Sequence, residues 1–452
     1  MGNVQLKTNN SLANLHKYEH AQCIAELESK YKIIDEEIFF KNLVNPSLNK
    51  LKPYYGWARY REAYSGELVK ELIKRSGIKT DKHFVYDPMS GSGSTLLAST
   101  ELDFDSIGND VNPYAVDISN AKLYRYTNKS LQIIERFIQD NLPSLKGKAF
   151  FTKTMKNCCH YFNDANNLVL QKIIDQISFI DDKPARLLLN AIWLTILEDC
   201  SNRKKDGNGL ATRETKVKDV WQHFRKIANN ILNDLKTYPL PRTSKAITIE
   251  DTAFNAKKII SSFSKTTGKK LGAIIFSPPY ANSFDYFESY KLELLCGYYA
   301  QEDLVKARNT AIRSFRKGYG YNLKTNNKYV ETICEEIRSR IPQKEKRTGV
   351  VDNRSRLVPN LLIGYFEDMG KTLGEFSLAM PKGSRCYIVV DQSAYLGVIV
   401  PSDLLLAQLG ELSGLEVESI IRCRTAKTSA QQLKEFSYLK TNLRESIVVL
   451  RK

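Results

Sequence analysis

Four consecutive residues, Ser277, Pro278, Pro279 and Tyr280, follow an apolar run that is typical of a buried strand. The two prolines fix the backbone and remove two N–H donors, so the carbonyl groups of Ser277 and Pro278 can act as acceptors facing one place. Tyr280 adds a ring on which a planar group can stack. This setting suits the exocyclic amine of a flipped nucleobase, because the carbonyls would accept its hydrogens and the ring would hold the base.

Such a site would activate the amine through hydrogen bonding. Engaging both amine hydrogens draws the nitrogen lone pair out of conjugation with the base, and the nitrogen can then attack a sulfonium methyl group. No strongly shifted general base is required, which fits a segment without a nearby histidine. A proline-rich turn between a strand and a helix is the alternative interpretation.

Residues 87–95 (DPMSGSGST) form a second segment that could bind a ligand, between a predicted strand and a predicted helix. Gly91 and Gly93 allow the backbone to pass close to a ligand, whereas a phosphate-binding P-loop is excluded because no Gly-Lys-Ser/Thr follows. Asp110 ends the next predicted strand, where a carboxylate can accept hydrogen bonds from ribose hydroxyls. An ordinary tight turn and a solvated aspartate would also explain these residues.

These segments require a sheet whose strand ends meet at one edge, and the hydrophobic pattern predicts one. Apolar runs alternate with amphipathic segments, which predicts a doubly wound, Rossmann-like α/β sheet with ligands at the carboxyl ends of the strands. The predicted strands are 83–86, 106–110, 246–249, 272–276, 386–390, 417–422 and 446–450, with helices at 66–76, 96–102, 361–379 and 402–413.

Two long stretches interrupt this alternation and are interpreted as mainly helical insertions. The first, 124–243, contains predicted helices at 166–178 and 185–199 and a basic loop from Asn202 to Lys218. The second, 285–360, is rich in basic and aromatic residues. We therefore expect a helical extension at 1–50 and a sheet domain made of 51–123, 244–284 and 361–452.

Together these segments resemble the DNA amino-methyltransferases of bacterial restriction-modification and related defence systems. The resemblance covers 52–123 and 244–284 well, and 361–452 by strand order alone. Asp87-Pro88-x-x-Gly91-x-Gly93 is similar to the family's cofactor motif, Asp110-Val111-Asn112-Pro113 to its acidic motif, and Ser277-Pro278-Pro279-Tyr280 to its catalytic motif. Residues 61–66 (REAYSG) are similar to its N-terminal cofactor-side motif, and Asp251-Thr252 to its third motif.

The resemblance implies methyl transfer from S-adenosylmethionine to a base amine, within a Rossmann-like methyltransferase sheet. A leading serine such as Ser277 is more usual in the family for cytosine N4, which favours that target over adenine N6. An RNA amino-methyltransferase and a catalytically silent nucleic-acid-binding protein are competing hypotheses. The implied cofactor-binding residues are Tyr64, Ser65, Asp87, Met89, Ser90, Gly91, Gly93, Ser94, Asp110, Val111, Asp251 and Thr252.

The charge balance favours a polyanionic partner. The chain has 67 Lys and Arg residues against 50 Asp and Glu residues, a net charge of +17, which suits double-stranded DNA, although a merely basic surface would give the same balance. A cognate restriction endonuclease is a further candidate partner. The expected DNA contacts are Arg203, Lys204, Lys205 and Arg213 in the first insertion, and Arg313, Arg316, Lys317, Tyr319 and Tyr321 in the second.

Cysteine usage and hydropathy bear on metal content and compartment. The eight cysteines include no Cys-x-x-Cys pair and no spacing typical of a zinc site, so we expect no metal and reduced thiols. No apolar run approaches the ~18–20 residues of a membrane helix, and the N-terminus lacks a signal-peptide core. We therefore expect a cytoplasmic protein with no membrane partner.

Overall fold

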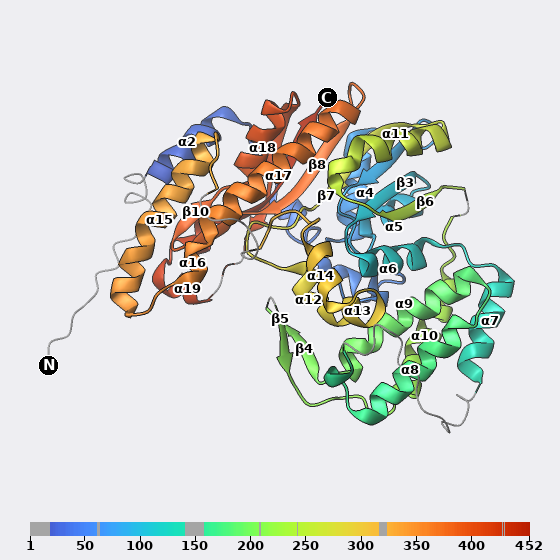
Figure 1. Ribbon diagram of the computed structural model, residues 1–452. Helices are drawn as coiled ribbons and strands as arrows, with labels where there is room; N and C mark the ends of the chain where they lie inside the picture. Colours follow the sequence, from blue (N-terminus) through green and yellow to red (C-terminus); the bar gives the residue numbers. More distant parts are fainter. Residues whose placement is uncertain are drawn as a thin grey trace. The chain divides into compact units, whose positions relative to one another are not determined.

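The computed structural model describes residues 19–60, 64–140, 158–207, 209–241, 243–315, 323–426, 428 and 430–452 (Figure 1). The chain forms two compact units, each described separately. Unit 1 contains Met1–Asn42, Ser277–Phe284 and Ile312–Lys452, and unit 2 contains Leu43–Phe276 and Asp285–Ala311.

Unit 2 is built on four parallel strands. Strand β2 (His83–Asp87) pairs with β3 (Asp105–Asp110) on one side and with β7 (Lys270–Phe276) on the other, and β3 also pairs with β6 (Ala246–Glu250). All three pairings are parallel, so the carboxyl ends of β2, β3 and β7 lie at the same edge. This strand order confirms the predicted Rossmann-like α/β class.

The helices that connect these strands begin and end at recognisable signals. In α4 (Gly66–Ser76), Ser65 accepts a hydrogen bond from the backbone of Leu68, and Gly77 ends the helix in the left-handed conformation. These bounds are the predicted ones. The other helices flanking the strands are α5 (Ser94–Glu101), α6 (Pro113–Leu123) and α11 (Ala256–Thr267).

The first insertion belongs to unit 2 and packs on α6. Apolar side chains of its helices share one hydrophobic cluster with Tyr114 and Ile118 of α6, and the buried Trp193 indole donates a hydrogen bond to the Leu170 carbonyl (2.9 Å). The predicted basic loop contains an antiparallel hairpin, β4–β5. The elements, shown mainly in green in Figure 1, are α7 (Asn128–Gln139), α8 (Asp164–Ser178), α9 (Lys183–Cys200), β4 (Arg203–Asp206), β5 (Gly209–Thr212) and α10 (Val220–Thr237).

Several short helices complete unit 2. A 3-10 turn, η2 (Tyr55–Trp57), lies ahead of α4, and the segment after the tetrapeptide contributes buried leucines to the insertion's hydrophobic cluster. The helices of that segment are α12 (Tyr286–Ser289), α13 (Lys291–Gly297) and α14 (Gln301–Arg308).

Unit 1 carries a mixed sheet. Strand β12 (Arg444–Arg451) pairs antiparallel with both β8 (Arg385–Asp391) and β11 (Glu416–Thr425), and β11 pairs in parallel with β1 (Ile33–Asp35). The first three are predicted strands, whereas β1 falls in the predicted helical extension. Its three residues are too few to show a period in the sequence.

Helices and short strands surround this sheet. Helix α15 packs against α2 and α17, and α17 packs against α18. The short strands β9 and β10 form a separate antiparallel pair. Their bounds are α2 (Glu19–Lys30), α3 (Glu37–Phe40), α15 (Lys328–Thr348), α16 (Asn353–Arg356), α17 (Val358–Ala379), β9 (Ser393–Tyr395), β10 (Val398–Val400), α18 (Ser402–Leu412), α19 (Ala430–Glu435) and α20 (Leu439–Asn442).

The compact units group the segments differently from the predicted domains. The predicted sheet domain contributes β2, β3, β6 and β7 to unit 2 and β8, β11 and β12 to unit 1. The expectation that all thiols are reduced also differs, because Cys158 and Cys296 form a disulfide inside unit 2, with Cα atoms 6.0 Å apart. A pairing across 138 residues leaves no spacing signal in the sequence.

Two further features bear on partners. None of the helices that the structure describes is long and apolar enough to cross a lipid bilayer. Within the same residues, no group of three or more His, Cys, Asp or Glu side chains is arranged to hold a metal ion.

Candidate active site

The glycine loop, residues 87–95, connects the end of β2 to the start of α5. Gly91 and Gly93 have positive φ angles of 48° and 83°. A Cβ at Gly93 would lie 2.2 Å from the Ser119 hydroxyl oxygen, and one at Gly91 would lie 2.8 Å from Cε1 of Tyr60. Both positions therefore require glycine, because backbone conformation and close packing each disfavour a larger residue.

Asp87 fixes the shape of this loop from inside. Its carboxylate accepts hydrogen bonds from the Met89 backbone (3.0 Å) and the Tyr64 hydroxyl (3.2 Å), and Tyr64 also hydrogen-bonds to Thr95. Burial raises the pKa of Asp87 to about 7. The predicted residues Asp87 and Tyr64 thus meet in the folded chain, and both brace the loop.

Asp110 joins the end of β3 to the glycine loop. One carboxylate oxygen accepts from the Gly91 backbone and the other from the Asn112 backbone, each at 2.9 Å. Desolvation raises the pKa of Asp110 to about 6, although these backbone donors oppose the shift. The carboxylate oxygens retain lone pairs for a ligand on the same edge of the sheet.

Asn109 is a site residue that the sequence patterns did not predict. Its buried side-chain amide donates to the carbonyls of Pro88 (2.9 Å) and Asp251 (3.0 Å), and its oxygen accepts from the Tyr86 hydroxyl (2.6 Å). It therefore holds together the ends of β2, β3 and β6. The available signal was an asparagine inside an apolar strand, directly before a candidate aspartate.

The other predicted cofactor residues occupy varied positions. Ser65 is fully buried and caps α4, so it acts on the fold, and Ser90 donates from its backbone to Asn109 (3.0 Å). The Asp251 carboxylate accepts from the Thr252 backbone and the Asn255 side chain. Met89, Val111, Asp251 and Thr252 are half-buried, and Ser94 is the first residue of α5.

The tetrapeptide follows Phe276, the last residue of β7, and is grouped with unit 1. The Ser277 hydroxyl donates to the Tyr280 hydroxyl oxygen (3.2 Å), which links the two ends of the motif. Pro278 is buried, while Ser277, Pro279 and Tyr280 are half-buried. Among the residues that the structure describes, no donor engages the carbonyl oxygen of Ser277 or Pro278.

Side chains of β9, in unit 1, hold the chain just after the tetrapeptide. The hydroxyls of Ser393 and Tyr395 both donate to the Ala281 carbonyl at 2.8 Å. Ser283 has a positive φ of 68° and hydrogen-bonds to Tyr395 (3.1 Å). Strand β9 therefore fixes the exit of the motif, a contact across more than one hundred residues that no local pattern indicates.

The predicted DNA contacts of the first insertion divide into exposed and engaged side chains. Lys204 is exposed, and Arg203 is half-buried with its guanidinium 5.2 Å from the centroid of the Tyr161 ring. Arg213 is half-buried and donates to the Glu198 carbonyl at the end of α9. Lys205 is buried and forms an ion pair with Glu293, which argues against a direct contact with DNA.

Arg313, in the second insertion, binds carboxylates of its own unit. Its guanidinium binds the Asp368 carboxylate through two hydrogen bonds (2.9 and 2.6 Å) and pairs with Glu367 (2.9 Å). These carboxylates raise the pKa of Arg313 above its usual range. The structure thus places Arg313 in a bidentate clamp on α17, whereas Arg316, Lys317, Tyr319 and Tyr321 lie outside the described residues.

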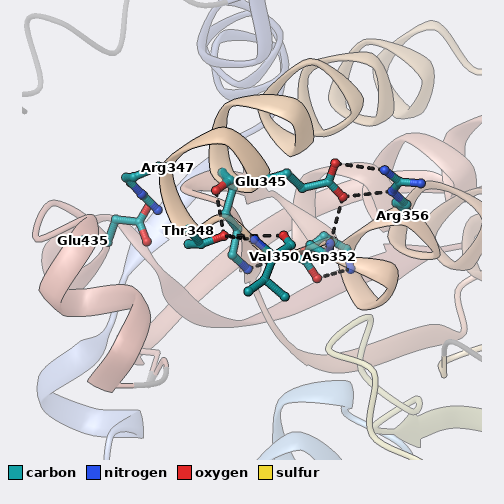
Figure 2. A network of polar contacts seen from close by, with 9 residues as sticks. Glu345, Arg347, Thr348, Val350, Asp352, Arg356 and Glu435 are labelled. Atoms are coloured by element: carbon teal, nitrogen blue, oxygen red, sulfur yellow. Dashed lines mark hydrogen bonds and ion pairs between the residues drawn. The ribbon is translucent and has the colours of Figure 1, made fainter.

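Basic residues at the end of α15 and in α16 are also paired with carboxylates (Figure 2). Glu345 accepts from Arg356 through both carboxylate oxygens (3.0 and 2.9 Å) and from the Asp352 backbone (2.8 Å), and Arg347 pairs with Glu435. This network connects α15 with α16 and α19. The positive charge of this segment therefore contributes less to a polyanion-binding surface than the sequence suggests.

Lys122 of α6 is a buried amine that holds the glycine loop, and its replacement by methionine is expected to remove a pH-dependent part of the stability. Its Nζ donates to the Ser92 carbonyl (3.0 Å), and burial lowers its pKa to about 7. Because the unfolded chain keeps an ordinary lysine pKa, the stability from this group rises as pH increases from about 7 towards about 10.5 and is constant below that window.

Urea unfolding at about pH 7 and at about pH 9.5 measures this rise. The Lys122→Met variant should lack it, whereas Lys129→Met, at an exposed position in α7, should retain it. A Lys122→Met variant with the wild-type pH profile would contradict this assignment.

Comparison with known proteins adds the family context. No protein-family model matches the chain. Similar proteins include the type II methyltransferase M.BsoBI of Geobacillus stearothermophilus, 26% identical over 94% of this chain and 91% of that protein. M.AvaI of Anabaena variabilis is 26% identical over 92% and 90%, and M.MjaII of Methanocaldococcus jannaschii is 22% identical over 72% and 76%. These relatives confirm the predicted resemblance.

Among solved structures, the rRNA methyltransferase aviRa from Streptomyces viridochromogenes covers 87% of this chain and 89% of its own. Its TM-score is 0.31 and its sequence identity is 10%, a likeness too weak to bear on the fold or the substrate.

Proposed function

We propose that this chain, which resembles type II methyltransferases over most of its length, is a DNA methyltransferase acting on the exocyclic amine of a flipped base. The observation that carries the proposal is the tetrapeptide Ser277–Tyr280 directly after β7, in a chain whose β2 and β3 end in a braced glycine loop and Asp110. The first motif suits the amine, and the second suits a nucleoside-containing cofactor.

The cofactor in this proposal is S-adenosylmethionine, which supplies an electrophilic methyl group when bound. The residues present fit such a group: Gly91 and Gly93 supply the left-handed turns that let the loop backbone pass close to a ligand, and the Asp110 carboxylate can accept from ribose hydroxyls. Asp251, at the end of β6, has carboxylate lone pairs for the adenine amine.

The tetrapeptide would prepare the target nitrogen. The carbonyls of Ser277 and Pro278 would accept the two amine hydrogens, which localises the lone pair on nitrogen, while the Tyr280 ring would stack on the base. The bound cofactor would supply the methyl group, its sulfur leaving with the bonding pair as the nitrogen–carbon bond forms, and the amine would lose one proton to solvent. The leading Ser277 favours cytosine N4 over adenine N6.

Duplex DNA is the proposed partner, and its contacts include the two surface-reaching basic residues of the hairpin, Arg203 and Lys204. The predicted contacts Arg316, Lys317, Tyr319 and Tyr321 remain part of the proposal. A restriction-modification setting with a cognate endonuclease, and a cytoplasmic location, are parts of the same proposal.

Cofactor binding is expected to strengthen as pH rises from about 5 to about 7. Burial raises the pKa of Asp110 to about 6 and that of Asp87 to about 7, so both carboxyls are largely protonated at the lower pH. The ionised forms complement ribose hydroxyls and a positive sulfonium, so binding releases protons and the affinity falls below these pKa values, by up to about tenfold per pH unit for each group.

Calorimetric titration of S-adenosylmethionine across this pH range measures the slope. Asp110→Asn should remove the part centred near pH 6 and keep the part that belongs to Asp87, moved to lower pH because the Asp110 charge helps to raise the pKa of Asp87. A wild-type affinity that does not change with pH would exclude this role for both carboxyls.

Methylome sequencing tests the proposed function directly. A host that expresses this chain should acquire a methylated base at one sequence motif, and a host that expresses Tyr280→Ala should not. N4-methylcytosine is the expected product, and N6-methyladenine as the only product would reverse the choice of base. Methylation of RNA without methylation of duplex DNA would overturn the DNA assignment.

A further inference from the structure

Tyr60 lies against the glycine loop, although no motif marks it. A Cβ on Gly91 would lie 2.8 Å from Cε1 of Tyr60, so the ring is packed on the loop backbone. Burial raises the pKa of the Tyr60 hydroxyl, and the nearby Asp110 carboxylate adds to the shift. Tyr60 therefore contacts the glycine loop and lies near the Asp110 carboxylate.

Tyr60 also stacks on Tyr290. Their ring centroids are 4.8 Å apart with an interplanar angle of 10°, and Tyr114 of α6 tilts against Tyr290 at 5.5 Å. Tyr290 has no exposed surface. A displacement of Tyr290 would consequently be felt by Tyr60, because close-packed interiors transmit strain.

Lys205 of the hairpin lies on Tyr290. Its Nζ is 4.3 Å from the centroid of the Tyr290 ring, forms an ion pair with Glu293 of α13 and lies 3.7 Å from Glu198. The Lys205 backbone also donates to the Glu198 carboxylate (3.0 Å). The hairpin is thus anchored at this residue by both side chain and backbone.

Lys205 differs from its neighbours in the hairpin. Lys204 and Asp206 are exposed, as strand alternation requires, whereas the Lys205 side chain retains 6% of its exposure. Burying an ammonium group is costly unless it is paired, and here the pair also contacts an aromatic ring. A two-stranded ribbon with exposed basic residues has a shape and charge that fit the DNA major groove.

We propose that Lys205 is a positioning residue that couples the β4–β5 hairpin to the cofactor site through Tyr290 and Tyr60. Engagement of DNA by the hairpin would move or stiffen Lys205, and the stacked rings would pass this change to Gly91. DNA and S-adenosylmethionine then bind cooperatively, and the effect is reciprocal. This inference rests on the proposed function.

The test measures the affinity for S-adenosylmethionine with and without saturating duplex DNA. The duplex carries the target motif in its methylated form, so that no further transfer occurs during the measurement. For the wild type we expect DNA to tighten cofactor binding on the order of tenfold. The double variant Lys205→Met/Glu293→Leu removes the ion pair without leaving one charge unpaired, and should reduce this ratio to about one while binding the cofactor alone within about threefold of the wild type.

Three further variants separate coupling from folding and from DNA affinity. Lys204→Met alters the exposed neighbour, so it should weaken DNA binding but keep the ratio at saturation. Tyr60→Phe preserves the stacked ring and should keep the ratio, whereas Tyr60→Leu should reduce the ratio to about one. The two Tyr60 variants decide the question if the double variant does not fold.

The outcomes distinguish the two proposals. A wild type that binds the cofactor and methylates DNA with a ratio of one, or a Tyr60→Leu variant that keeps the wild-type ratio, overturns the coupling alone. A wild type that does not bind S-adenosylmethionine overturns the proposed function itself.

Discussion

Replacing Tyr280 with alanine is expected to lower the rate of methyl transfer by about 100-fold. Stacking of a base on an aromatic side chain is worth about 1–3 kcal/mol, and the loss falls on the step in which the flipped base must be held still. The hydroxyl of Tyr280 accepts from Ser277 at 3.2 Å, so the ring is also fixed relative to the head of the motif. Transfer of labelled methyl to duplex DNA under single-turnover conditions measures the effect.

Tyr280→Phe is the matched control for this prediction. It keeps the ring and removes only the hydrogen bond with Ser277, so the rate should stay within about fivefold of the wild type. Cofactor affinity should be unchanged in both variants, because Tyr280 is not among the proposed cofactor-binding residues. Equal losses in the phenylalanine and alanine variants would show that the hydroxyl, rather than the ring, is the functional group.

Replacing Gly93 with alanine is expected to weaken S-adenosylmethionine binding by at least about 30-fold. Gly93 has a φ of 83°, and its Cβ would lie 2.2 Å from the Ser119 hydroxyl oxygen, which itself hydrogen-bonds to Thr248 (2.6 Å). A left-handed conformation costs a non-glycine residue roughly 1–2 kcal/mol, and overpacking a core adds about 1–3 kcal/mol. Relief of both requires the loop to move, and the cofactor site moves with it.

Gly268→Ala provides the comparison that separates the cost of the left-handed backbone from the cost of the clash with Ser119. Gly268 follows α11 with a φ of 73°, and a Cβ there would meet no atom within 4 Å. Its replacement should lower the melting temperature slightly and leave cofactor affinity unchanged. If Gly93→Ala behaves in the same way, the clash with Ser119 is relieved without disturbing the loop, and the proposed cofactor role of the loop loses its support.

Much of the local structure could be predicted from the sequence, for reasons that lie within short segments. The apolar runs located β2, β3, β6 and β7, and the amphipathic pattern of 66–76 located α4, whose ends the structure shows to be capped by Ser65 and Gly77. Period, caps and turn residues act over a few neighbours, so they are visible without the fold. The three-residue β1 and the hairpin β4–β5 were missed, because one is too short and the other lies in a segment whose charge and glycines predict a loop.

The tetrapeptide at 277–280 and the glycine loop at 87–95 were determined by sequence alone, since each is a contiguous run with its own chemistry. Only the tertiary structure determined which of the predicted basic side chains pair with carboxylates of the same chain. Lys205 meets Glu293 across 88 residues, and Arg313 meets Asp368 across 55, so two predicted DNA contacts became internal ion pairs. The reason is physical: a basic side chain carries the same charge wherever it lies, but its burial and its partner depend on contacts between distant segments.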